Sequence, residues 1–106
     1  MAWVILFVAG LLEIVWAVAM KQSHGFTRLA PSLVTLAGMA GSIVFLALAM
    51  RNLPLGTAYT VWTGIGAVGA FAVGIAFLGE PANLMRLAAA AMIVAGLVLM
   101  KLASAG

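Results

Sequence analysis

The chain has 106 residues, of which 67% are hydrophobic and only 7% are charged, and its formal net charge is +3. This composition excludes a soluble globular domain, in which about a quarter of the residues are charged, and it is typical of an integral membrane protein. The five basic residues lie singly along the chain, which argues against a nucleic-acid partner, and the absence of cysteine excludes disulfides and thiolate metal sites.

Four apolar runs divide the chain, and each is close to the roughly 20 residues that a helix needs to cross the bilayer core. We therefore predict an all-α membrane protein in which residues 1–106 form a single domain of four transmembrane helices. The helices are expected at approximately residues 3–20, 31–50, 57–78 and 85–101. The linkers hold most of the charged residues and the turn-forming pairs Leu53-Pro54 and Glu80-Pro81, so no soluble domain remains.

The first run contains Glu13, the one acidic residue within any of the four runs. A carboxylate at the centre of a membrane helix costs about 2.5–3.5 kcal/mol on insertion scales, so an intramembrane acid indicates a functional site. Gly10 and Trp16 share its helix face, one on each side, which predicts a slot beside the carboxylate. The alternative role for Trp16 is in the interfacial aromatic belt, although it lies well inside the run.

The second run contains Ser42, among glycines and apolar neighbours. Two interpretations are equally open for its hydroxyl. It either bonds to the backbone of its own helix and serves packing, or it is a hydrogen-bond partner for Glu13.

The third run brings Tyr59 and Trp62 onto one stripe at a spacing of three. Their hydroxyl and indole N–H can bond a carboxylate, and their rings can enclose a flat cation. Residues 64–69 match G-x-G-x-x-G, but no strand precedes them, which argues against a dinucleotide site. Gly64 and Gly66 instead predict a bend and a close helix approach, and we expect them to act as a conformational hinge.

The fourth run is rich in alanine, with Ala89 and Gly96 seven residues apart. Small residues at this spacing fit a seam between two subunits. They fit a plain packing face within one subunit equally well.

Membrane orientation follows the asymmetry of Lys and Arg between the two sides. With the amino terminus inside, two basic residues are cytoplasmic and three are outside: Arg51 and Lys101 against Lys21, Arg28 and Arg86. Such a small bias favours dual topology, although a single orientation set by one charge stays equally open. Because four helices can barely surround a polar cavity, we expect a homodimer, and opposite insertion would give it a two-fold axis in the membrane plane.

Four stretches together resemble the small multidrug resistance transporters, and specifically their guanidinium-exporter branch. They are EIVWA at 13–17, GFTRL at 25–29, LPLGTAY at 53–59 and WTGIG at 62–66. The resemblance covers essentially the whole chain. Trp16 and Thr63 make the chain similar to the guanidinium branch in particular. The polyaromatic-drug branch usually lacks a tryptophan at the position of Trp16 and has serine at the position of Thr63.

This resemblance implies an antiparallel, dual-topology homodimer in the cell's plasma (inner) membrane that exports guanidinium ion, and small substituted guanidinium compounds, in exchange for protons. It also implies that Glu13 of both subunits forms the shared site and that four further residues line it, with Gly10 giving room: Trp16, Ser42, Tyr59 and Trp62. We expect no enzymatic activity, cofactor or metal, because His24 is the only histidine and lies in a linker.

Three alternatives remain open from the residues. A quaternary ammonium or multidrug cation exporter of the same family would need a wider cavity without matched hydrogen-bond acceptors. A small passive ion channel would conduct without proton coupling. A structural subunit of a larger complex would leave Glu13 as a costly residue without a purpose.

Overall fold

All regular secondary structure over residues 1–104, which a computed structural model describes, is α-helical. Its elements are α1 (Ala2–Gln22), α2 (Leu29–Ala49), α3 (Leu55–Phe77) and α4 (Leu84–Ala103), with no strand among the described residues. Each helix is long and apolar enough to cross a membrane. The prediction of an all-α protein with four membrane-length helices is confirmed.

Each end of the observed helices differs from the predicted span by one or two residues. α2 begins at Leu29, two residues before the predicted start at Pro31, because proline is tolerated in a first turn whose N–H groups lack helical partners. α1 continues through Gln22 and stops at Ser23. The Ser23 hydroxyl donates to the Met20 carbonyl at 2.7 Å and accepts from the Phe26 N–H at 3.0 Å, so it closes the turn that ends the helix.

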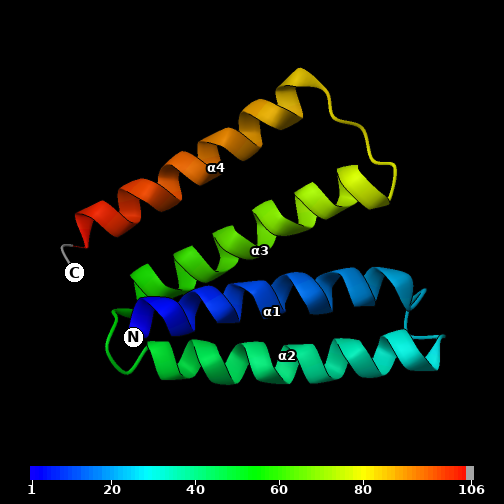
Figure 1. Ribbon diagram of the computed structural model, residues 1–106, viewed down its shortest axis with the longest axis horizontal. Coiled ribbons are helices and arrows are strands. Elements are labelled where there is room, and N and C mark those ends of the chain that lie inside the picture. The colour runs from blue at the N-terminus through cyan, green and yellow to red at the C-terminus, as the bar shows by residue number, and fades with distance from the viewer. Residues whose placement is uncertain (105–106) are drawn as a thin grey trace.

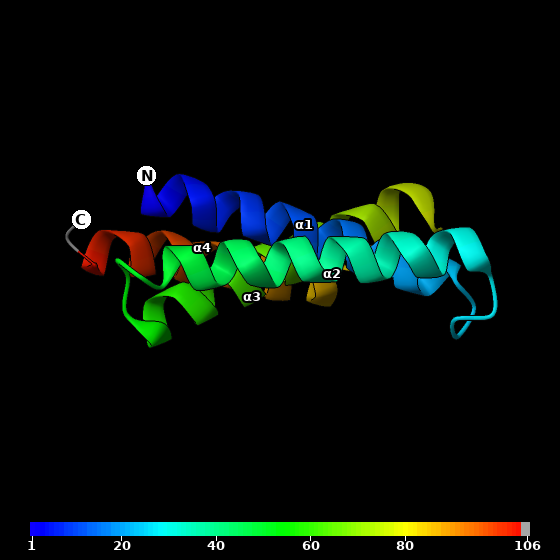
Figure 2. The same ribbon diagram turned by 90° about the horizontal axis from the view of Figure 1, so that it is seen from below.

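Helix α1 lies between α2 and α3, and these three helices pack side by side (Figure 1). The molecule is a thin slab of 43 × 34 × 16 Å, as the second view shows (Figure 2). Its buried core lies where the three helices meet and includes Leu6, Ala9, Leu46, Val61 and Trp62. The slab therefore has very little interior.

Helix α4 stands apart from the other three (Figure 1). It has no buried residue, and its backbone approaches α3 alone among the described helices. Two cations hold its ends: the Arg86 guanidinium lies 5.0 Å from the centre of the Phe71 ring, and the Lys101 ammonium lies 4.6 Å from the Trp3 ring. Each contact places a cation over an aromatic face, an arrangement that contributes about 0.5–1 kcal/mol at exposed sites.

The outer face of α1 carries large apolar side chains at helical spacing. Val4, Phe7, Leu11 and Val15 are all exposed, with between 43% and 57% of each residue accessible. So much exposed apolar surface is not tolerated in water and requires lipid or another protein chain against it.

Candidate functional site

Glu13 lies near the middle of α1, on the side that faces α3. Its Oε1 atom is buried and has no hydrogen-bond partner among the described residues. The only ion pair within residues 1–104 joins Arg86 to Glu80 at 3.4 Å, in and next to the α3–α4 loop. The Glu13 carboxylate therefore has neither a protein cation nor a protein donor to compensate it, a state that a bound cation or proton would relieve.

Gly66 of α3 makes room for this carboxylate. A methyl group at Gly66 would collide with the Glu13 carboxyl group and would lie 2.8 Å from its Cγ atom. One turn further along, a methyl group at Gly69 would collide with the Ile14 side chain. The absence of side chains at these two positions is what lets α1 press Glu13 and Ile14 against the backbone of α3.

Trp16 lies one turn after Glu13 on α1. Its indole Nε1 is also buried without a hydrogen-bond partner among the described residues. Gly38 of α2 admits it, since a methyl group there would be only 3.0 Å from the Trp16 Cβ atom. The Trp16 indole N–H, an unpaired donor, and the Glu13 Oε1 atom, an unpaired acceptor, thus lie on neighbouring turns of one helix. A molecule that both accepts and donates hydrogen bonds, such as water, suits this pair and can bridge the two groups.

Ser42 links the three packed helices. Its hydroxyl is fully buried, donates to the Ala9 carbonyl of α1 at 2.7 Å, and accepts from the Trp62 indole N–H of α3 at 2.9 Å. The Ser42 hydroxyl bonds neither to the backbone of its own helix nor to Glu13. The observed bonds therefore differ from both interpretations that the sequence left open. By α-helix geometry the Ala9 carbonyl also accepts from the backbone N–H of Glu13, so Ser42 is attached to the turn that carries the acid.

Tyr59 continues this chain of contacts outward. Its ring centre lies 5.5 Å from that of Trp62 with the planes tilted by 46°, a favourable aromatic geometry. Tyr59 is half exposed and lines a groove of about 570 Å³ between α3 and α4 together with Thr63. The predicted stripe of polar groups on α3 is therefore divided, with Trp62 facing inward and Tyr59 facing the groove.

The small residues that the sequence singled out sit at close contacts or in the groove. Gly10 faces α3, where a methyl group would be 2.6 Å from an Ile65 atom, so its space is filled by packing. Gly64 faces the α4 side chain Leu97, and α3 runs as one helix through Gly64 and Gly66. Ala89 and Gly96 line two separate cavities between α3 and α4.

Three contacts at this site escaped the sequence analysis: the Gly66 approach to Glu13, the Gly38 approach to Trp16, and the bond from Ser42 to the Ala9 carbonyl. The glycines themselves were visible in the sequence. Which side chain each one meets depends on how the helices are rotated about their axes, and no local pattern carries that information. Among the described residues, no group of three or more His, Cys, Asp or Glu side chains could hold a metal ion.

Comparison with known proteins places these features in a family context. A family model described as "Small Multidrug Resistance protein" matches residues 1–94. The chain is 59% identical over 104 residues to a protein of Escherichia coli K12 named guanidinium exporter, covering 98% of this chain and 99% of that protein. It is 58% and 60% identical over 104 residues to proteins of the same name from Yersinia pestis and Proteus vulgaris, covering 98% of this chain and all of each relative.

Proposed function

The chain belongs to the small multidrug resistance family and is a multi-pass protein of the plasma membrane, and from this we propose that it exports guanidinium ion in exchange for protons. Small substituted guanidinium compounds are included in the proposed substrate class. The near full-length relatives named guanidinium exporter support the choice of cation.

One observation carries the proposal at the level of the site. The Glu13 carboxylate lies inside a membrane helix with a buried oxygen that no described residue bonds or neutralises. Such a group is costly unless it binds something, because lipid cannot solvate it. A cationic cargo and a proton are the two species that would each compensate it.

Guanidinium suits this carboxylate better than a generic cation does. It is planar and offers N–H donors in a fork that matches two carboxylate oxygens, and its flat face suits aromatic contact. Trp16, one turn after Glu13 on α1, and Trp62, one turn before Gly66 on α3, supply the aromatic faces in this proposal. In this proposal Trp16, Ser42, Tyr59 and Trp62 line the cation site, and Gly10 provides the close packing beside it.

The working unit in this proposal is an antiparallel homodimer in which Glu13 of both subunits shares one site. A slab 16 Å thick cannot enclose a cation alone, whereas two copies provide eight helices. The exposed apolar stripe of α1 and the unburied α4 offer surface for a partner. We assign Ala89 and Gly96 to the seam between subunits, because no atom lies within 4 Å of a methyl group placed at Gly96.

Exchange follows from competition for the acidic pair. Two carboxylates that share one site titrate as a coupled pair. If a proton and guanidinium cannot occupy the pair together, and if the dimer switches sides only when one of them is bound, outward guanidinium movement is tied to inward proton movement. Gly64 and Gly66 are the proposed hinge for that switch.

The experiment that tests the proposal measures guanidinium-driven proton movement in proteoliposomes that contain the purified protein. Wild type should move protons with guanidinium and little with tetraethylammonium. Glu13→Gln should abolish the exchange, because the amide keeps the size of the side chain but cannot titrate or carry charge. Glu80→Gln is the matched control, since it removes the other acid, which is paired in the α3–α4 loop, and it should leave the exchange nearly unchanged.

The competing functions give different results in the same assay. Stronger proton movement with tetraethylammonium than with guanidinium would instead identify a quaternary ammonium exporter. A persistent current without proton coupling would identify a passive channel. Wild-type exchange by Glu13→Gln would remove the carboxylate from the mechanism.

A further inference from the structure

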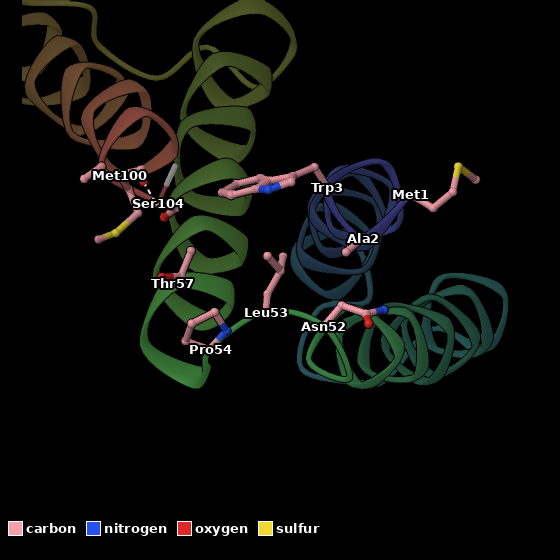
Figure 3. Close-up of a pocket in the computed structure, with 10 residues that line it drawn as sticks. Met1, Ala2, Trp3, Asn52, Leu53, Pro54, Thr57, Met100 and Ser104 are labelled. Carbon is pink, nitrogen blue, oxygen red and sulfur yellow. Dashed lines mark hydrogen bonds between the residues drawn. The ribbon is translucent and has the colours of Figure 1, made fainter. Parts of the chain in front are cut away.

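A further cavity lies at the end of the bundle that holds the start of α1 and the end of α4, away from Glu13. It has a volume of about 730 Å³ and lies among the start of α1, the α2–α3 turn and the end of α4. Figure 3 shows the side chains that line it, among them Trp3, Asn52, Leu53 and Thr57. Glu13 is ten residues along α1 from Trp3, which is about 15 Å of helix, so this cavity lies at a different depth from the Glu13 carboxylate. It shares one wall residue, Met100, with the groove that Tyr59 lines.

The depth of this cavity in the membrane follows from helix length. Helices of 20 to 23 residues span about 30 Å, the thickness of the hydrocarbon core. Their ends therefore lie at the boundary between hydrocarbon and headgroups. Trp3 and Lys101, which contact each other at 4.6 Å, are residue types that favour this boundary.

The cavity walls are amphipathic. Trp3, Leu53 and Met100 contribute apolar surface, whereas Asn52 and Thr57 contribute an amide and a hydroxyl. Neither of these two polar side chains bonds to any described residue, so both have donors available for a ligand. A molecule with a polar head and an apolar body matches such walls.

Among residues 1–104, the charged side chains at this end of the bundle are all basic. Lys101 lies against the ring of Trp3, which lines the cavity, and Arg51 directly precedes the lining residue Asn52 in the α2–α3 turn. Of the two acids in the chain, Glu13 is in the middle of α1, and Glu80 is in the α3–α4 loop at the opposite end (Figure 1). The cavity thus favours an anion over a cation or a zwitterion.

From the size, depth, walls and charge of this cavity, we propose that it binds the headgroup of an anionic phospholipid. The phosphate lies near Lys101 and the Thr57 hydroxyl, and the glycerol backbone lies against Trp3 and Leu53. The Asn52 amide, on the other side of Leu53 (Figure 3), donates to the outer part of the headgroup. This site serves neither the cargo nor the proton of the proposed exchange, and the inference holds whether or not guanidinium is the cargo.

The test is lipid competition on the detergent-purified full chain, read by native mass spectrometry. The protein is offered equal amounts of phosphatidylglycerol and phosphatidylcholine, which share the phosphate and differ in net charge. Wild type should retain phosphatidylglycerol in preference. Lys101→Gln should lower that preference about fivefold, which corresponds to the loss of one basic residue near an anionic headgroup.

The matched control is Arg86→Gln, which removes the same charge at the opposite end of α4 and should keep the wild-type preference. Asn52→Leu and Thr57→Val change the cavity walls without changing charge, and each should reduce retention of phosphatidylglycerol. Circular dichroism of every variant verifies that the helices are intact.

Three results would overturn the proposal. The first is an equal loss of preference in Lys101→Gln and Arg86→Gln, which would reduce the effect to overall charge. The second is wild-type lipid retention in Lys101→Gln and both cavity variants. The third is full displacement of the lipid by millimolar inorganic phosphate, which would identify a site for the free anion.

Discussion

At the residue scale, Ser42 is the side chain among residues 1–104 whose hydrogen bonds join the most helices, since they link α2 to both α1 and α3. It is fully buried and is bonded at once to the Ala9 carbonyl and to the Trp62 indole. A hydroxyl with two hydrogen-bond partners restrains the position of each. One oxygen atom therefore orients the Trp62 ring and positions the turn of α1 that carries Glu13.

We expect Ser42→Ala to lower the stability of the protein by about 1–3 kcal/mol, because the buried Trp62 N–H would lose its acceptor. The measurement is the midpoint of thermal unfolding of the detergent-purified protein. Ser32→Ala is the control, since the Ser32 hydroxyl is exposed and bonds only to the preceding turn of its own helix. Equal midpoints for the two variants would show that the bonds of Ser42 contribute nothing net.

Trp16 is predicted to discriminate between cations by shape. Trp16→Gly should loosen the preference for flat cations over bulky ones, because it removes a buried indole one turn from Glu13. The ratio of transport rates for guanidinium and tetraethylammonium measures this in proteoliposomes. Trp3→Gly is the matched control at the end of the same helix, and a ratio that Trp16→Gly leaves at the wild-type value would place Trp16 outside the site.

At the scale of the elements, the α1–α3 contact is the one that shapes the site. Gly66 and Gly69 form a smooth strip on α3, and α1 packs its acid against that strip. The fit is tight enough that a single methyl group has no room.

Gly66→Ala should therefore force Glu13 or the whole of α1 to shift, and we expect guanidinium exchange to fall at least about tenfold, as displacement of a reacting group by about 1 Å can cause a far larger loss. Gly56→Ala is the control, because it lies in the first turn of the same helix and no atom is within 4 Å of the added methyl group. Both variants should be assayed in the same proteoliposomes. Wild-type exchange by Gly66→Ala would mean that Glu13 has another position in the working protein.

The existence of the four helices could be predicted from the sequence because apolar runs of membrane length have few other solutions. Their ends were less certain: α2 begins before Pro31, since the first turn does not need the missing N–H. Glu13 could also be selected from the sequence as a candidate site residue, because a lone acid in a long apolar run is conspicuous, and its role stays a prediction. The bond from Ser42 to Ala9 was not, because 33 residues separate them and the contact depends on how α1 and α2 face each other.

At the scale of the whole molecule, the distribution of charge between the two ends decides how the chain enters the membrane. Arg51 and Lys101 lie at the end that holds the start of α1 and the end of α4, and Lys21, Arg28 and Arg86 lie at the other. The difference of one basic residue is a weak instruction. It is compatible with the antiparallel dimer that we propose.

Two lysines added to the turn that contains Arg51 should fix a single orientation, with this turn in the cytoplasm. Exchange by the variant expressed alone should then fall, because antiparallel partners no longer form. Accessibility labelling of a single introduced cysteine verifies the orientation, and co-expression with a variant fixed in the opposite orientation should restore exchange. Full activity of one verified orientation alone would refute the antiparallel requirement.

The thinness of the subunit has a genetic consequence. The subunit is 16 Å thick, which is little more than the width of about 10–12 Å of one helix with its side chains. Almost every residue is therefore close to an outer surface of the subunit. If two identical copies enclose the cargo, one gene encodes both walls of the site. Every substitution is then present in both subunits, once on each side of the cargo. A change confined to one wall would require two different copies of the gene in the same cell, so asymmetry in such a protein can arise only by duplication.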